Sequence, residues 1–121
     1  MLFDVERTTL AGRPCLTVRG ELDLATAPEL ATAVASLLAE SPSALVIDLT
    51  PTTFMDSSGA RELVRGARTA AAAGIELLVV APQSHGSVRL TIDLLELRSI
   101  VPIVDSVADL PTRIAGRDVG S

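Results

Sequence analysis

The chain contains no lysine, tryptophan or tyrosine, and it has a single cysteine and a single histidine among its 121 residues. Cys15 has no partner for a disulfide within the chain, and His85 has no cysteine or second histidine with which to build a structural zinc site. We therefore expect no metal and no other cofactor. A reducing cytoplasmic environment is expected, with Cys15 buried or inert rather than paired with another chain.

Long apolar runs and an excess of positive charge are also missing. The longest apolar runs, such as residues 77–82, are far shorter than a bilayer requires, and no basic segment followed by an apolar one opens the chain. The net charge is −5, and only Phe3 and Phe54 could stack on bases. We expect a soluble protein that has neither a membrane nor a nucleic acid as its partner.

The length and composition are those of one globular domain. The chain is 48% hydrophobic and 21% charged, and a chain of this size buries roughly two-thirds of its unfolded surface without disulfides. No repeat, linker or low-complexity tract interrupts it. We expect one domain over residues 1–115 and a frayed tail over residues 116–121.

Strand and helix signals alternate along the chain. Residues 2–7 and 14–21 are rich in β-type side chains on either side of a turn, which predicts an antiparallel hairpin. A helix is expected after Thr26, with Pro28 in its first turn and Glu29 completing a capping box with Thr26. Further strands are predicted over 44–49, 75–81 and 100–104, further helices over 57–73, 82–95 and 107–114, and a loop over 50–53. This order predicts an α/β fold: a mixed, mainly parallel sheet of about five strands, with the hairpin at one side, covered by about four helices.

The segment Asp56-Ser57-Ser58-Gly59 stands where a buried strand and a short loop lead into an amphipathic helix. Functional groups gather at such places in open α/β sheets. Two hydroxyls at a helix N-terminus lie near unpaired backbone N–H groups and the positive end of the helix dipole, which could accommodate a phosphate attached there. Ordinary helix capping explains the same residues and is favoured on local grounds alone.

The wider context changes that balance. The segments Phe54-Met55-Asp56-Ser57-Ser58-Gly59, Gly20-Glu21-Leu22-Asp23 and Val46-Ile47-Asp48-Leu49 together resemble the STAS domain family. The resemblance is closest to the stand-alone bacterial anti-sigma factor antagonists of that family, and it extends over almost the whole chain. It implies a STAS-type single domain that acts as a switch and not as an enzyme.

The resemblance also implies how the switch operates. The second hydroxyl of the motif, here Ser58, is phosphorylated in the family by a serine kinase that is also the anti-sigma factor. The unphosphorylated antagonist binds this kinase and frees a sigma factor, phosphorylation blocks the binding, and a PP2C-type phosphatase resets the system. The switch would therefore act on transcription through protein partners, and we expect it to be a monomer or weak dimer.

Five further residues belong to the expected motif and partner surface. By the same resemblance, Asp23 lies near the phosphorylation site and helps to engage the kinase, although a solvated turn residue would look the same. Asp56, Ser57 and Gly59 complete the motif, with Ser57 expected as a cap. Arg61 begins a basic series on the polar face of the helix, which is either an ordinary solvated face or a stripe that meets acidic groups on a partner.

Other functions fit the residues less well. A receiver domain could use Asp48 as its phosphoacceptor, but receivers depend on a lysine, and we expect Asp48 to bond the following loop. A serine hydrolase needs a Gly-x-Ser-x-Gly turn, and Met55 and Asp56 stand where glycine would be. A ligand-sensing STAS module that binds a nucleotide or lipid remains the alternative, although the chain has no glycine-rich phosphate loop.

Overall fold

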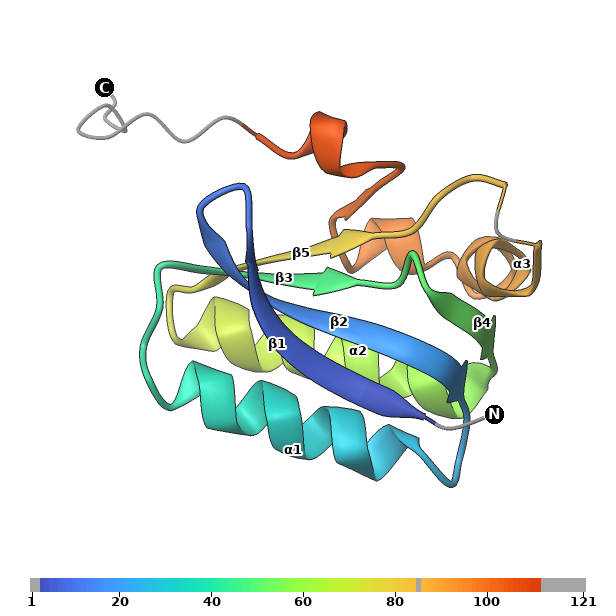
Figure 1. The fold of residues 1–121 in the computed structure, drawn as a ribbon, viewed down its shortest axis with the longest axis horizontal. Helices are drawn as coiled ribbons and strands as arrows, with labels where there is room; N and C mark the ends of the chain where they lie inside the picture. Colours follow the sequence, from blue (N-terminus) through green and yellow to red (C-terminus); the bar gives the residue numbers. More distant parts are fainter. Residues whose placement is uncertain (1–2, 85, 112–121) are drawn as a thin grey trace.

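The computed structural model describes residues 3–84 and 86–111, which form one mixed sheet with helices against it (Figure 1). Helices α1 (Ala27–Leu38) and α2 (Ser57–Ala72) lie side by side on one face, and α3 (Gly86–Leu94) packs near one end of the sheet. The strands are β1 (Asp4–Leu10), β2 (Arg13–Leu22), β3 (Ala44–Asp48), β4 (Thr52–Met55), β5 (Glu76–Val80) and β6 (Ile103–Val104). Two short 3₁₀ helices, η1 (Leu97–Ser99) and η2 (Val107–Asp109), follow α3 and β6.

The strand order is β1-β2-β3-β5-β6, with β4 paired to the far end of β2. Among the described strands only the β1–β2 hairpin is antiparallel, and its turn places Ala11 and Gly12 at positive φ, as tight hairpin turns require. All other pairs are parallel. The prediction of a mixed, mainly parallel sheet with an N-terminal hairpin is therefore confirmed.

On the side away from β1, strand β2 pairs with two strands in succession. Its first half pairs with β3 and its last three residues pair with β4. The register slips between Gly20 and Glu21, where Gly20 has a φ of 95°, a conformation that glycine adopts without strain. The slip leaves Thr53 of β4 without a partner in the ladder, and beyond it β4 continues parallel to β2.

The core lies mainly between the sheet and the pair α1 and α2. Strand β3 is buried on both faces over Ala44–Ile47, as its continuous apolar run predicts. On the helix-covered face, Leu30 and Leu37 of α1 and Leu63 of α2 pack against the sheet. The opposite face carries a smaller cluster formed by Cys15, Val46, Leu78 and Val80, on which Leu110 packs.

Several predicted elements differ from the structure. The loop predicted at 50–53 contains the start of β4, the helix expected from residue 82 begins at Gly86, and the strand expected over 100–104 is limited to Ile103–Val104. The helix expected over 107–114 begins as the 3₁₀ turn η2, after which Leu110 is extended. The rest of that prediction, with the tail 116–121, lies outside the described residues. The described residues thus contain three α-helices, against about four expected, and six strands, against about five.

The predicted capping box at the start of α1 is wrong. Thr26 is the N-cap residue, but its backbone is already helical and its side chain makes no capping bond. Its hydroxyl donates instead to the carbonyl of Glu21, at 2.7 Å. The carboxylate of Asp23 accepts from the backbone N–H groups of Ala25 and Thr26, at 3.0 and 3.2 Å, so an Asx turn formed by Asp23 organises this connection.

Candidate functional site

The site begins with the aspartate that caps α2. Asp56 has extended backbone angles, and its Oδ1 accepts from the backbone N–H groups of Ser58 and Gly59, at 2.9 and 3.3 Å. Its own N–H donates to the carbonyl of Leu22 at the end of β2. The expectation that Ser57 acts as the cap is therefore wrong, because Asp56 is the N-cap and Ser57 is the first helical residue.

Ser58 occupies the second position of the helix. Its side chain is half-buried, whereas Ser57 is exposed. Within residues 3–84 and 86–111, the Ser58 hydroxyl has no hydrogen-bond partner, while its backbone N–H is held by Asp56. Asp56 therefore holds the backbone of Ser58, and among the described residues no hydrogen bond engages its hydroxyl.

Gly59 allows the helix to approach the sheet closely. A Cβ atom at this position would lie 2.7 Å from Cγ of Leu22, 2.9 Å from its carbonyl oxygen and 2.9 Å from Cγ of Met55. Such distances are too short for any side chain, so only glycine permits this packing. Gly59 is itself buried and acts on the site by setting the position of Ser58.

The sheet brings the two predicted motif segments together. In the parallel β2–β4 pair, Glu21 faces Phe54 and Leu22 faces Met55. Asp23 and Asp56 therefore follow directly from neighbouring strand ends, in the order that the motif resemblance implies. The structure places these two carboxylates and the start of α2 at one carboxyl edge of the sheet.

Exposed apolar side chains flank this edge, and no motif in the sequence marks them as part of a site. Leu24, in the turn after β2, is 74% exposed, and Phe54 on β4 is 40% exposed. The sequence does contain a signal for both, since Leu24 and Phe54 are apolar residues within polar connecting segments. Arg61 is exposed one turn after Ser58, so the edge presents apolar and charged groups together.

Helix α3 supports the site from the side. The hydroxyl of Thr91 donates to the carbonyl of Met55 at 2.6 Å, and the hydroxyl of Ser87 accepts from the N–H of Met55 at 3.4 Å. These bonds satisfy the backbone N–H and carbonyl groups of Met55, the residue immediately before Asp56, on the side that β2 does not cover. Sequence patterns gave no indication of this contact, because it depends on how α3 packs.

The remaining candidates have ordinary surroundings. Asp48 accepts from the backbone N–H and the hydroxyl of Thr50, at 2.9 and 2.6 Å, which confirms the expected bonds to the following loop.

Burial raises the pKa of the Cys15 thiol. In the described part of the chain, no three histidine, cysteine or acidic residues could hold a metal, and no helix is long and apolar enough to cross a membrane.

Comparisons with known proteins agree with this geometry. The family model for the STAS domain matches residues 4–110. The anti-sigma-F factor antagonist RsfB of Mycobacterium tuberculosis is 42% identical over 52 residues, and this match covers 43% of each of the two chains. A crystal structure of an anti-sigma factor antagonist from Mycobacterium paratuberculosis is similar with a TM-score of 0.76 and 28% identity, covering 89% of this chain and 90% of that one.

A more distant likeness concerns the fold alone. The Bacillus cell fate determinant SpoIIAA, in its phosphorylated form, superposes with a TM-score of 0.59 at 17% identity, covering 85% of this chain and 91% of that chain. The family model spans the whole of the sheet and the three α-helices described above. The chain belongs to the STAS domain family.

Proposed function

We propose that this protein is an anti-sigma factor antagonist that works by partner switching in the bacterial cytoplasm. In its unphosphorylated form it binds an anti-sigma factor serine kinase and so releases a sigma factor. Phosphorylation of Ser58 by that kinase ends the binding, and a PP2C-type phosphatase restores it. The protein itself catalyses no reaction and acts as a monomer or weak dimer. The two similar mycobacterial proteins, both anti-sigma factor antagonists, support this assignment.

The observation that carries the proposal is the position of the Ser58 hydroxyl. It has no hydrogen-bond partner among the described residues, it follows the Asp56 cap, and it lies on the edge that also presents Leu24 and Phe54. Interfaces combine an apolar centre with a polar rim, and large apolar anchors supply much of their binding energy. Asp23, Ser57 and Arg61 would form part of the rim, and Gly59 would hold the surface in shape.

Charge explains why a phosphate would break this contact. A phosphoserine carries nearly two negative charges, and on Ser58 it would stand beside the Asp56 carboxylate, which already accepts the N–H groups of Ser58 and Gly59. A partner carboxylate about 6 Å away would cost about 3 kcal/mol per unit charge at an effective dielectric of about 20. That is about a hundredfold in affinity. The helix dipole returns only about 0.3 to 1 kcal/mol, so we expect loss of binding without unfolding.

The experiment combines phosphosite mapping with a pull-down from the native cell. Mass spectrometry should find phosphate on Ser58, and wild-type bait should retain an anti-sigma factor kinase that Ser58→Glu bait loses. Ser57→Ala is the matched control, because it removes the neighbouring hydroxyl at the rim, and it should keep most of the kinase binding. Phosphate on Ser57 alone, or full retention of the kinase by Ser58→Glu, would overturn the assignment.

A second pair of variants tests the surface rather than the phosphate. Phe54→Ala should weaken kinase binding about tenfold or more, since it removes a large anchor from the edge beside Ser58. Ile100→Ala is the control: Ile100 is 44% exposed, similar to Phe54, but it lines a hollow with Ile75 and Glu76 at the opposite, amino end of β5. Both variants should melt within a few degrees of wild type. Equal losses of affinity would argue against a docking surface at the Ser58 edge.

A further inference from the structure

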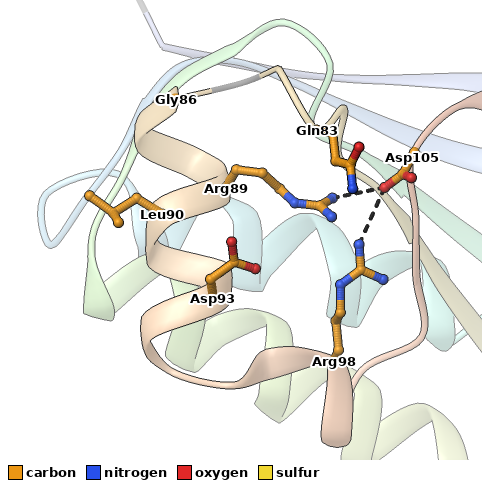
Figure 2. A pocket seen from close by; sticks show the side chains of 7 residues that line it. All are labelled: Gln83, Gly86, Arg89, Leu90, Asp93, Arg98 and Asp105. Atoms are coloured by element: carbon orange, nitrogen blue, oxygen red, sulfur yellow. Dashed lines mark hydrogen bonds and ion pairs between the residues drawn. The ribbon is translucent and has the colours of Figure 1, made fainter.

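A pocket lies between α3 and the segments that follow β5 and β6, at the same carboxyl edge of the sheet as Ser58 but lined by other residues (Figure 2). Its volume is about 690 Å³. It is open to solvent and lined by Gln83, Gly86, Arg89, Leu90, Asp93, Arg98 and Asp105. Two cations and two anions therefore meet in a space large enough for a small metabolite.

One wall of the pocket is a pair of arginines that share a single carboxylate oxygen. Arg89 is only 7% exposed. Its Nη1 donates to the carbonyl of Ala81 at 2.6 Å and lies 3.1 Å from Oδ1 of Asp105. Nη2 of Arg98 lies 3.3 Å from the same Oδ1, so two positive charges face one negative charge. This wall keeps an excess of one positive charge.

Arg98 is the member of the pair that can reach a ligand. Its side chain is about half exposed, at 47%. Within the described part of the chain, its Nη1 donates to the carbonyl of Ile103 and its Nη2 contacts Asp105, whereas a guanidinium carries five N–H donors. The remaining donors are free to bind a carboxylate, the group that the guanidinium fork fits best.

Asp93 lies on α3, one turn after Arg89, and Arg98 lies across the pocket from it on η1 (Figure 2). Asp93 is exposed, and among the described residues its carboxylate has no hydrogen-bond or ion-pair partner. Leu90, one turn earlier on α3, is 58% exposed and gives this side an apolar surface. The pocket thus offers Arg98 on one side and Asp93 on the other, with an apolar contact beside Asp93.

We propose that this pocket binds a small zwitterion that carries a carboxylate and an amine. The carboxylate would bind Arg98, supported by the fixed charge of Arg89, and the ammonium group would lie against Asp93. The four charged side chains balance one another, so the pocket has no surplus positive charge for a polyphosphate such as a nucleotide. The proposal does not depend on the function assigned to Ser58, because none of its residues belongs to that site.

Matched ligands that differ only in the amine test the proposal. Three pairs of ligands are titrated into the isotope-labelled protein: glycine and acetate, γ-aminobutyrate and butyrate, and ε-aminocaproate and caproate. Binding is followed by the NMR shifts of the backbone amide signals. At least one amino acid should bind about fivefold more tightly than its partner acid. Asp93→Asn should remove that difference, and this variant should fold normally, since it disrupts no described side-chain contact.

The arginine half of the site is tested by Arg98→Gln, which should weaken the amino acid and its partner acid alike by about tenfold or more. Arg68→Gln is the control, because Arg68 is exposed on α2, away from this pocket, and it should leave binding unchanged. The proposal is overturned if no ligand shifts the signals of residues around the pocket. It is also overturned if each amino acid and its partner acid bind wild type equally, or if Asp93→Asn keeps the preference.

Discussion

Replacing Gly59 by alanine should destabilise the protein, although alanine is the better helix former. The new methyl group would lie 2.9 Å from the carbonyl oxygen of Leu22 and closer still, at 2.7 Å, to its Cγ. The leucine side chain could rotate away, but the backbone oxygen belongs to β2 and also accepts the N–H of Asp56. The start of α2 must therefore move away from the sheet.

The size of the effect follows from two opposing terms. Forcing an extra carbon into a packed region costs about 1 to 3 kcal/mol. Alanine returns up to about 1 kcal/mol in helix propensity, and less than that in the first turn. We expect a net loss of about 1 to 2 kcal/mol in the free energy of unfolding. For a domain of this length, that lowers the melting temperature by about 4 to 8 °C.

The same helix contains its own control at Gly66. A Cβ atom there would lie 3.4 Å from Cγ1 of Val34 and 3.6 Å from Cδ1 of Leu77, which are ordinary contacts. Gly66→Ala should therefore stabilise the protein by about 0.5 to 1 kcal/mol, because it removes a flexible residue from the helix interior and crowds nothing. The two glycines should respond to the same substitution with opposite signs.

Urea denaturation followed by circular dichroism at a helix band measures both variants on one scale. The slope of the unfolding free energy with urea should stay constant, so that midpoints report stability directly. If Gly59→Ala matched wild type within about 0.3 kcal/mol, close packing against Leu22 would not be the reason for the glycine. A strong loss in Gly66→Ala would equally refute the reasoning, because it would mean that α2 tolerates no added carbon anywhere.

Three further predictions follow from single side chains. Asp56→Ala should cost about 1 kcal/mol of stability in urea, whereas Asp56→Asn, which keeps an acceptor, should retain most of it. The hydrogen bond from Arg7 lowers the pKa of Glu40, so the contribution of this pair is present above the carboxyl pKa of the unfolded chain and is lost as pH falls through the depressed value. Arg7→Gln should raise the Glu40 pKa in an NMR titration. Burial raises the pKa of Cys15, and its thiol should resist alkylation at neutral pH until the protein is unfolded.

The sequence predicted the sheet and its main helices because these elements carry strong local signals. The continuous apolar run at 44–49 indicated a strand buried on both faces, and Ala44–Asp48 is that strand. The motif at Asp56 indicated a helix start, and α2 begins one residue later, at Ser57. Periodicity and capping residues act over a few positions, so they can be read from the chain itself.

The features that were missed depend on residues far apart in the chain. Strand β4 is four residues long and follows Pro51, which locally favours a loop. It becomes a strand because the last three residues of β2 offer it a partner, and because α3 bonds Met55 from the other side. No window of sequence contains all three segments, so local reasoning could not find this strand.

The error at Thr26 has a related cause and bears on the site. Thr26 and Glu29 have the spacing of a capping box, which is why one was predicted. In the structure, however, the carboxylate of Asp23, three residues before Thr26, accepts a hydrogen bond from the N–H of Thr26. Asp23 thus bonds its own turn and is less free to reach a partner than an aspartate on an open surface. If Asp23 engages a kinase, it can do so only through its second oxygen or by opening the turn. Its substitution should then alter the path of the chain around Leu24 as well as the local charge, which makes Asp23 an ambiguous probe of the partner surface and Phe54 a cleaner one.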